Sequence, residues 1–232
     1  LGCALTGSCG SVSEVQARLL DGLKVVTVAR DLDHPWGLTF LPDGKALITE
    51  KGGRMRLVAL TGQQAPQVIE GLPPVRDEGQ GGLLDVALDP DYTNQPWVYW
   101  SYSEAGTGPE ARLSGTAVAR GQIKDGRMAQ VEVIYRQRPK VEGSGHFGSR
   151  LVFARDKTLF ITLGERQKDQ PSKPGRDHAQ NVASALGKVV RIQRDGGIPN
   201  DNPRFAGSGA LPELWSIGHR NPQGAALHPV TG

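Results

Sequence analysis

A short pattern of strand, turn and strand recurs along this chain, and it constrains the fold more than any other feature of the sequence. The first copy covers residues 37–49 and turns through a Pro-Asp-Gly sequence between two apolar runs. Such turn residues between apolar runs are typical of a β-hairpin. Further copies cover residues 85–102 and 150–163, and a fourth begins at residues 225–229. The chain is therefore expected to be built from repeated antiparallel units.

The copies are spaced like the blades of a β-propeller. Their equivalent positions, Phe40, Leu88, Phe153 and Leu227, are 48, 65 and 74 residues apart. A four-stranded blade takes about 40 to 50 residues, so the longer intervals indicate blades with loop insertions. Glycine and proline number 31 and 16. They make up about 20% of the chain against an average near 12%, which fits many tight turns and argues against a helical bundle.

We therefore expect an all-β fold, a β-propeller of four-stranded antiparallel blades, with about four blades in this chain and the last one incomplete. Stacking sheets around an axis buries the face that a single sheet would leave in contact with water. A β-sandwich is the alternative, but it does not predict hairpins at corresponding places. The blades are expected over residues 23–232, with an outer strand at 25–29. An N-terminal segment over residues 1–22 is expected to contain a short helix at 12–20.

The remaining composition excludes several classes of function. The net charge of +3 comes from 27 basic and 24 acidic residues that are well mixed, so no nucleic-acid partner is expected. No apolar run reaches the roughly 18 residues of a transmembrane segment. Cys3 and Cys9 are the only two cysteines. Three interpretations of them stay open: a terminal disulfide, two idle thiols, or a Cys3 that is lipid-anchored after removal of an export signal.

Three polar, glycine-rich stretches precede the first strand of a copy. They cover residues 77–82, 142–150 and 218–224. In a propeller these first strands line the central channel, so the loops that lead into them meet at one mouth of the channel. Glycines in such loops allow the backbone to approach a flat ligand closely. The polar side chains expected to meet there are Gln80, His146, Arg220 and Asn221.

Five motifs, in this order, give the chain a family resemblance. They are Pro-Trp-Gly-Leu at residues 35–38 and the runs at residues 78–88, 146–153, 198–203 and 218–224. With these motifs the chain resembles, over about residues 34–232, the soluble quinoprotein glucose and aldose sugar dehydrogenases. The resemblance implies a six-bladed, exported, calcium-dependent propeller. It also implies oxidation of the C1 hydroxyl of aldoses to lactones, with pyrroloquinoline quinone (PQQ) as hydride acceptor.

The resemblance implies roles for five residues. His146 matches the catalytic base, and Gln80 matches a polar residue beside sugar and cofactor. Arg220 and Asn221 match the pair at the quinone carbonyls, and Glu165 matches an acidic residue that orients the base or binds sugar. The chemistry agrees, because hydride leaves C1 readily only when the hydroxyl proton is removed, and an imidazole is suited to that task near neutral pH. The charge of Arg220 also suits negative charge on a reduced quinone oxygen.

Each of these residues also has a structural interpretation. His146 then only bonds a loop carbonyl, Gln80 is a loop amide, and Arg220 with Asn221 forms a fork and turn cap. Glu165 is in that case a solvated or arginine-paired carboxylate. No metal ligand is assigned in this chain, because four further histidines have no spacing typical of a zinc site. They are His34, His178, His219 and His228.

Departures from the family pattern limit what this chain is expected to do alone. Gly145 precedes the base where glucose-specific members can carry an acidic group, which favours the broader aldose dehydrogenases. The basic residues that hold the PQQ carboxylates, and the calcium ligands, are expected beyond the end of this chain. Without cationic partners, binding of the three PQQ carboxylates is expected to be much weaker.

We therefore expect the N-terminal portion of a periplasmic or secreted aldose dehydrogenase that is weak or inactive by itself. Its expected partners are an aldose, an artificial or respiratory electron acceptor, and a C-terminal portion or second chain that completes the propeller. Two alternatives remain. One is a propeller-derived module that binds a sugar or a partner without catalysis, and the other is a structural propeller fragment with relic motifs.

Overall fold

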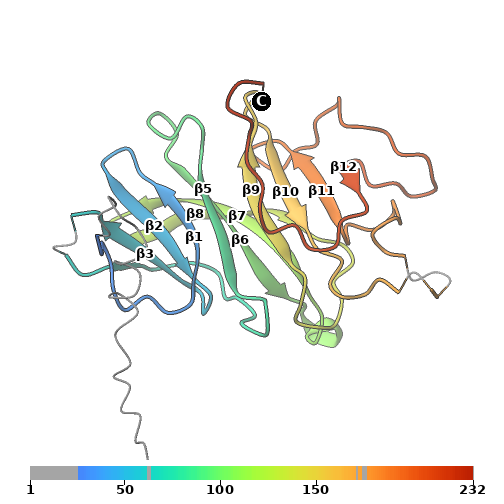
Figure 1. Cartoon of the computed structure of the whole chain (residues 1–232), viewed down its shortest axis with the longest axis horizontal. Coiled ribbons are helices and arrows are strands. Elements are labelled where there is room, and N and C mark those ends of the chain that lie inside the picture. Colours follow the sequence, from blue (N-terminus) through green and yellow to red (C-terminus); the bar gives the residue numbers. More distant parts are fainter. Residues whose placement is uncertain (1–25, 62–63, 171, 174–176, 232) are drawn as a thin grey trace, which may run out of the picture.

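Three four-stranded antiparallel sheets stand side by side in the computed structural model, which describes residues 26–61, 64–170, 172–173 and 177–231 (Figure 1). Apart from the short 3-10 helix η1 (Gly108–Glu110), the regular structure of this part is all strand. The strands are β1 (Pro35–Phe40), β2 (Lys45–Glu50), β3 (Arg54–Ala59), β4 (Gln67–Ile69), β5 (Leu83–Leu88), β6 (Trp97–Ala105), β7 (Ser114–Lys124), β8 (Arg127–Arg136), β9 (Gly148–Phe153), β10 (Leu159–Leu163), β11 (Lys188–Ile192) and β12 (Leu214–Ile217).

Each sheet is built from four consecutive strands, which confirms the predicted propeller architecture. The sheets contain β1 to β4, β5 to β8 and β9 to β12, and every strand pairs with its neighbour in sequence. The three positions predicted to be equivalent, Phe40, Leu88 and Phe153, are the last residues of β1, β5 and β9. These first strands contact one another from sheet to sheet. They therefore form the inner edge of the blades, and a β-sandwich is excluded.

The core fills the two spaces between successive sheets. One cluster joins the first and second sheets around Leu47, Met55 and Trp100, and another joins the second and third sheets around Tyr99 and Ile161. Successive side chains of a strand point to opposite faces, so Trp100 and Tyr99 on β6 enter different clusters. The middle sheet is thus covered on both faces, which explains why six consecutive residues of β6 are buried.

Two predicted strands are not formed. Residues 26–29 are not a strand, and their apolar side chains are not buried: Val26 and Val28 are 63% and 39% exposed. The fourth copy, at residues 225–229, also has no strand conformation. The described residues therefore hold three complete sheets, and the fourth blade, predicted to be incomplete, has no strand. The predicted helix at 12–20 and both cysteines lie outside the described residues.

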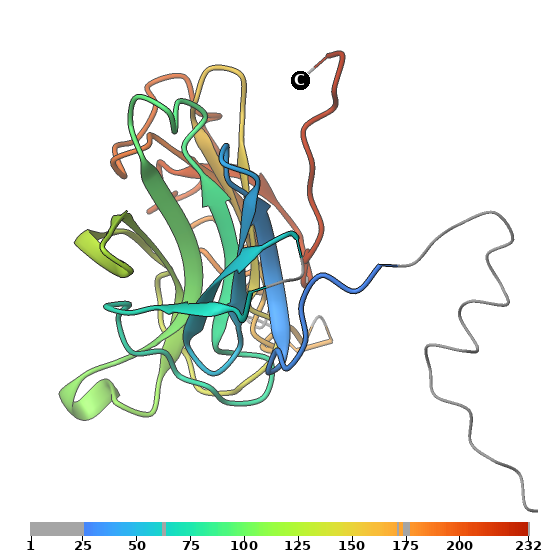
Figure 2. The same ribbon diagram turned by 90° about the vertical axis from the view of Figure 1, so that its left-hand side faces the viewer.

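The fourth copy nevertheless lies where the inner strand of a next blade is expected. Arg150 Nε donates a hydrogen bond to the carbonyl of Gln223 (3.1 Å), and Arg155 donates to the carbonyl of Pro229 (2.9 Å). This C-terminal segment and β1 lie on the same side of the molecule (Figure 2). In the part of the chain that the structure describes, there is no helix able to span a membrane.

A buried hydroxyl on the second strand of each sheet links that sheet to the next inner strand. In the first sheet the Thr49 hydroxyl accepts a hydrogen bond from the Gly37 N–H (2.8 Å) of its own inner strand, and donates to the carbonyl of Leu84 on β5. The other two links have the same form. In the second sheet the Ser101 hydroxyl accepts from the Asp85 N–H (2.9 Å) and donates to the carbonyl of Ser149 (2.7 Å). In the third sheet the Thr162 hydroxyl accepts from the Arg150 N–H (2.9 Å) and donates to the carbonyl of Pro222 (2.7 Å). One hydroxyl thus satisfies two buried backbone groups at each junction.

We predict that Thr49→Val, Ser101→Ala and Thr162→Val each lower the free energy of unfolding by about 1 to 3 kcal/mol, because each change leaves a buried N–H and a buried carbonyl unpaired. Urea unfolding measures the loss. Thr93→Val, at an exposed turn position, is the matched control and should stay within about 0.5 kcal/mol. Losses no larger than that control would show that the links do not hold the sheets together.

Candidate active site

Three loops that precede inner strands are tied together by hydrogen bonds. The His146 N–H donates to Gln80 Oε1 (2.8 Å), and the Gln80 N–H donates to the carbonyl of Ser144 (2.7 Å). On the other side the Gly148 N–H donates to Asn221 Oδ1 (2.9 Å). Residues predicted from sequence to meet, although up to 141 positions apart, therefore lie together at one end of the sheets.

The His146 ring is paired with the buried carboxylate of Glu165. Nδ1 of His146 lies within hydrogen-bonding distance of Glu165 Oε1, and the two side chains are 13% and 4% exposed. Glu165 Oε2 accepts from the Asp169 N–H (2.8 Å), and the Glu165 N–H donates to the carbonyl of Arg220 (2.8 Å). Glu165 is thus held at both its backbone and its side chain.

These contacts determine which nitrogen of His146 is available. Burial raises the pKa of Glu165, but the hydrogen bonds from the Asp169 N–H and the His146 ring outweigh it, so that the pKa is lowered overall. An ionised carboxylate only accepts hydrogen bonds, so Nδ1 must carry the proton. The lone pair of the neutral ring is then on Nε2, which has no hydrogen-bond partner among the described residues. The arrangement provides an oriented base.

The backbone at His146 is unusual. His146 has a φ of +52°, in the left-handed region that non-glycine residues rarely adopt. Its carbonyl lies against Gly164, where an added Cβ would come within 2.0 Å of that oxygen. Gly164 must therefore stay a glycine if Glu165 is to reach the His146 ring. Strained backbone of this kind is often found at functional sites.

Arg166 is a site residue that the sequence analysis missed. Its side chain is fully buried and forms no ion pair with a carboxylate of the described residues. Its Nε donates to the carbonyl of Gly145 (2.9 Å), and one terminal nitrogen donates to the carbonyl of Ser114 (2.6 Å). The guanidinium also lies 3.7 Å from the centre of the Phe147 ring. Burial and the charge of Arg76 lower the pKa of Arg166 to about 10, against a smaller opposing effect of Glu165. Arg166 therefore anchors the loop that carries His146.

A polar pocket of about 320 Å³ is lined in part by Glu165, whereas His146, Gln80 and Asn221 are not among its lining residues. Arg220 lines it, and its exposed guanidinium forms no hydrogen bond or ion pair within the described residues. The Asn221 amide nitrogen is likewise without a protein partner in this part of the chain, because only its oxygen is used. The full lining is Glu165, Gln167, Asp169, Ala179, Gly218, His219 and Arg220.

Lys188 supports the wall of this pocket from inside. It is fully buried, and its Nζ donates to the carbonyls of His178 (2.9 Å), Ala179 (2.8 Å) and Leu186 (2.6 Å). Burial lowers the pKa of Lys188 to about 8, although Asp169 and Asp177 oppose the shift. Burial and the nearby Lys188 charge also lower the pKa of His219.

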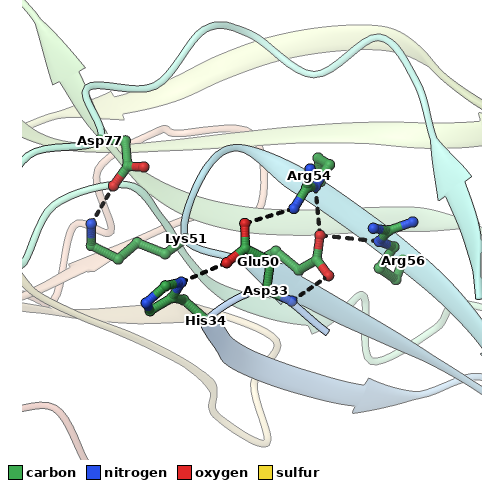
Figure 3. Close-up of polar contacts among 7 residues, drawn as sticks. All are labelled: Asp33, His34, Glu50, Lys51, Arg54, Arg56 and Asp77. Atoms are coloured by element: carbon green, nitrogen blue, oxygen red, sulfur yellow. Dashed lines mark hydrogen bonds and ion pairs between the residues drawn. The ribbon is translucent and has the colours of Figure 1, made fainter. Parts of the chain in front are cut away.

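A second polar cluster, on the first sheet, is structural. Buried Glu50 accepts hydrogen bonds from the Arg54 Nε (2.7 Å), the Arg56 Nε (3.0 Å) and the Asp33 N–H (2.9 Å) (Figure 3). The exposed His34 ring pairs only with Asp33, and Lys51 pairs with Asp77 at the start of the loop before β5. These contacts fasten the segment before β1 and the loop before β5. No group of three or more metal-ligating side chains occurs in the described ranges.

Known proteins resemble the chain along most of its length. The family model for glucose/sorbosone dehydrogenase matches residues 32–232. The aldose sugar dehydrogenase YliI of Escherichia coli is 44% identical over 209 residues, which cover 88% of this chain and 53% of that protein. Quinoprotein glucose dehydrogenase B of Acinetobacter calcoaceticus is 26% identical, over 87% of this chain and 45% of that protein. The chain thus spans about half the length of these curated relatives.

Solved structures agree with the architecture. A crystal structure of a glucose dehydrogenase superimposes with a TM-score of 0.80 at 42% identity, over 90% of this chain and 59% of that one. The PQQ-bound form of an aldose sugar dehydrogenase from Streptomyces coelicolor gives a TM-score of 0.69 at 29% identity, over 85% of this chain and 54% of that one.

We predict that Glu165→Gln removes a pH-dependent part of the stability. The lowered pKa of Glu165 means that its contribution is present above the ordinary value of 4.5 and is lost as the pH falls through the folded-state pKa. The difference in unfolding free energy between wild type and Glu165→Gln should therefore shrink between pH 6 and pH 3. Glu110→Gln, at an exposed position, is the control. A difference that is constant with pH would contradict an ionised, stabilised Glu165.

We also predict that Arg166→Met lowers the free energy of unfolding by about 2 to 4 kcal/mol, because it leaves the buried carbonyl of Gly145 without its donor and removes the bonds to the carbonyls of Ser114 and Gly143. Chemical denaturation measures this, with Arg112→Met as the control, since the Arg112 side chain is 85% exposed. Equal effects of the two substitutions would show that Arg166 does not anchor the loop.

Proposed function

The chain belongs to the glucose/sorbosone dehydrogenase family, and we propose that it forms the part of a PQQ-dependent aldose sugar dehydrogenase that carries the catalytic base. The observation that carries this proposal is the pairing of His146 with buried Glu165 at the meeting point of three inner-strand loops. The proposed reaction converts the C1 hydroxyl of an aldose to the carbonyl of a lactone.

His146 acts as the base in this proposal. Its Nε2 takes the proton of the C1 hydroxyl while the hydrogen on C1 leaves as hydride, so one proton and one hydride, together two electrons and two protons, leave the sugar in that step. PQQ, when bound, supplies the hydride acceptor. The Glu165 carboxylate keeps the ring oriented through Nδ1 and stabilises the positive charge that the ring gains.

Gln80 and the pair Arg220 and Asn221 have binding roles in the proposal. The Gln80 side chain is exposed, and its oxygen already accepts the His146 N–H, so its amide nitrogen remains to donate to a sugar hydroxyl. The guanidinium of Arg220 and the amide nitrogen of Asn221 are adjacent donors without protein partners in the described residues. Such donors fit the oxygens of a quinone and stabilise negative charge on them.

The described residues provide binding groups for only part of the cofactor. PQQ has three carboxylates, and Arg220 is one cation beside the site. We therefore propose that the other cationic ligands, and the ligands of a calcium ion, come from a C-terminal portion or a second chain. Export to the periplasm or the medium, and transfer of electrons to a respiratory or artificial acceptor, are part of the same proposal and rest on the family resemblance.

The test is dye-linked oxidation of aldoses with added PQQ and Ca²⁺. His146→Ala should lower kcat/KM by about 10²- to 10⁴-fold, the usual contribution of a positioned base. His228→Ala, at an exposed position far along the C-terminal segment, is the control and should keep wild-type rates. Turnover that survives His146→Ala would remove the proposed base.

The isolated 232-residue chain should show weak or no turnover in the same assay. The reason is that most of the expected cofactor ligands are not among its described residues. Full activity of this chain alone would contradict the need for further residues. Sugar binding without turnover, in any form of the protein, would instead favour a sugar-binding module.

A further inference from the structure

Three consecutive residues after β10 reach the loop that carries His146, but only one of them is free to meet a ligand. Glu165 contacts the His146 ring, and Arg166 donates to the carbonyl of Gly145. Both side chains are buried and have their polar atoms engaged. Gln167 is exposed, lines the 320 Å³ pocket, and its amide makes no hydrogen bond to the described part of the chain.

The Gln167 amide occupies the space beside Gly145 that a side chain would otherwise take. An added Cβ on Gly145 would lie 2.4 Å from Gln167 Oε1 and 2.9 Å from Nε2. Gly145 is buried, and its φ is not in the left-handed region, so the backbone itself does not require glycine there. The absence of a side chain at this position therefore makes room for the amide.

The backbone holds Gln167 in this place against its own preference. Arg166 and Gln167 have φ values of +58° and +57°, two successive left-handed residues that are not glycine. Each such residue costs about 1 kcal/mol or more, and the conformation persists because surrounding contacts enforce it. The buried hydrogen bonds of Glu165 and Arg166 supply that enforcement.

We propose that Gln167 is a specificity-determining residue that contacts the sugar hydroxyl on C2, and that Gly145 provides the space for its amide. This inference rests on the proposed function. The C2 hydroxyl is the neighbour of the reacting carbon, and Gln167 lies against the residue that immediately precedes His146. An amide both donates and accepts hydrogen bonds, as a hydroxyl does, so it can pair with a hydroxyl in one C2 configuration better than in the other.

The experiment compares glucose with mannose, which differ only at C2, in the dye-linked assay with PQQ and Ca²⁺ on a form of the protein that turns over aldoses. Gln167→Ala and Gly145→Ala should each change the ratio of the two kcat/KM values by about tenfold, the effect of one lost hydrogen bond. Because both changes remove the same amide from the pocket, the double variant should match the single ones and not add to them.

Two matched controls have the same chemistry away from the pocket. Gln64→Ala is at an exposed position in the loop between β3 and β4, and Gly224→Ala has no atom within 4 Å of its added Cβ. Both should leave the ratio unchanged. A crystal structure of Gly145→Ala should show the Gln167 side chain displaced, a result that does not depend on activity.

The outcomes separate this inference from the proposed function. No turnover of any aldose by any form of the protein would overturn both. Turnover with an unchanged ratio in Gln167→Ala would overturn the role of Gln167 alone. Additive effects in the double variant, or an undisplaced Gln167 in Gly145→Ala, would overturn the link between Gln167 and Gly145.

Discussion

The fold depends on how one sheet is joined to the next. A single four-stranded sheet leaves one face exposed, and here the apolar clusters between sheets cover those faces without fixing a register. The register between neighbouring sheets is set by the hydroxyls of Thr49, Ser101 and Thr162. Each hydroxyl bonds one backbone group of the inner strand in its own sheet and one backbone group of the segment that follows at the next junction. Asp85 adds to the second junction by accepting from Leu151 N–H and Arg150, although burial raises its pKa.

The site follows from that register. Once the inner strands are aligned, the loops that lead into them end at one place, and His146 is held there from several directions. Gln80 precedes the second sheet's inner strand, Asn221 follows the third sheet, and Glu165 and Arg166 follow β10. A base oriented by groups from separate elements needs little reorganisation when a substrate arrives. The strained φ of His146 is the conformational consequence of this arrangement.

Sequence reasoning predicted the parts that depend on local patterns. The hairpin turns gave the equivalent ends of β1, β5 and β9, and the glycine-rich loops gave the meeting of Gln80 with His146. It failed where the outcome depends on a partner in space. The apolar run at 26–29 pairs with no strand and stays largely exposed. No sequence pattern singles out Arg166 or Gln167, because nothing local shows that one becomes buried or that Gly145 leaves room for the other.

In the proposed reaction His146 is the base, and the lone pair that takes the proton is on Nε2. Nitrogen-resolved NMR of the imidazole ring, on the protein without cofactor at neutral to mildly alkaline pH, tests this most directly. We expect a protonated Nδ1, with its proton shifted strongly downfield by the Glu165 carboxylate, and an unprotonated Nε2. A ring that carries its proton on Nε2 and leaves Nδ1 bare would contradict it.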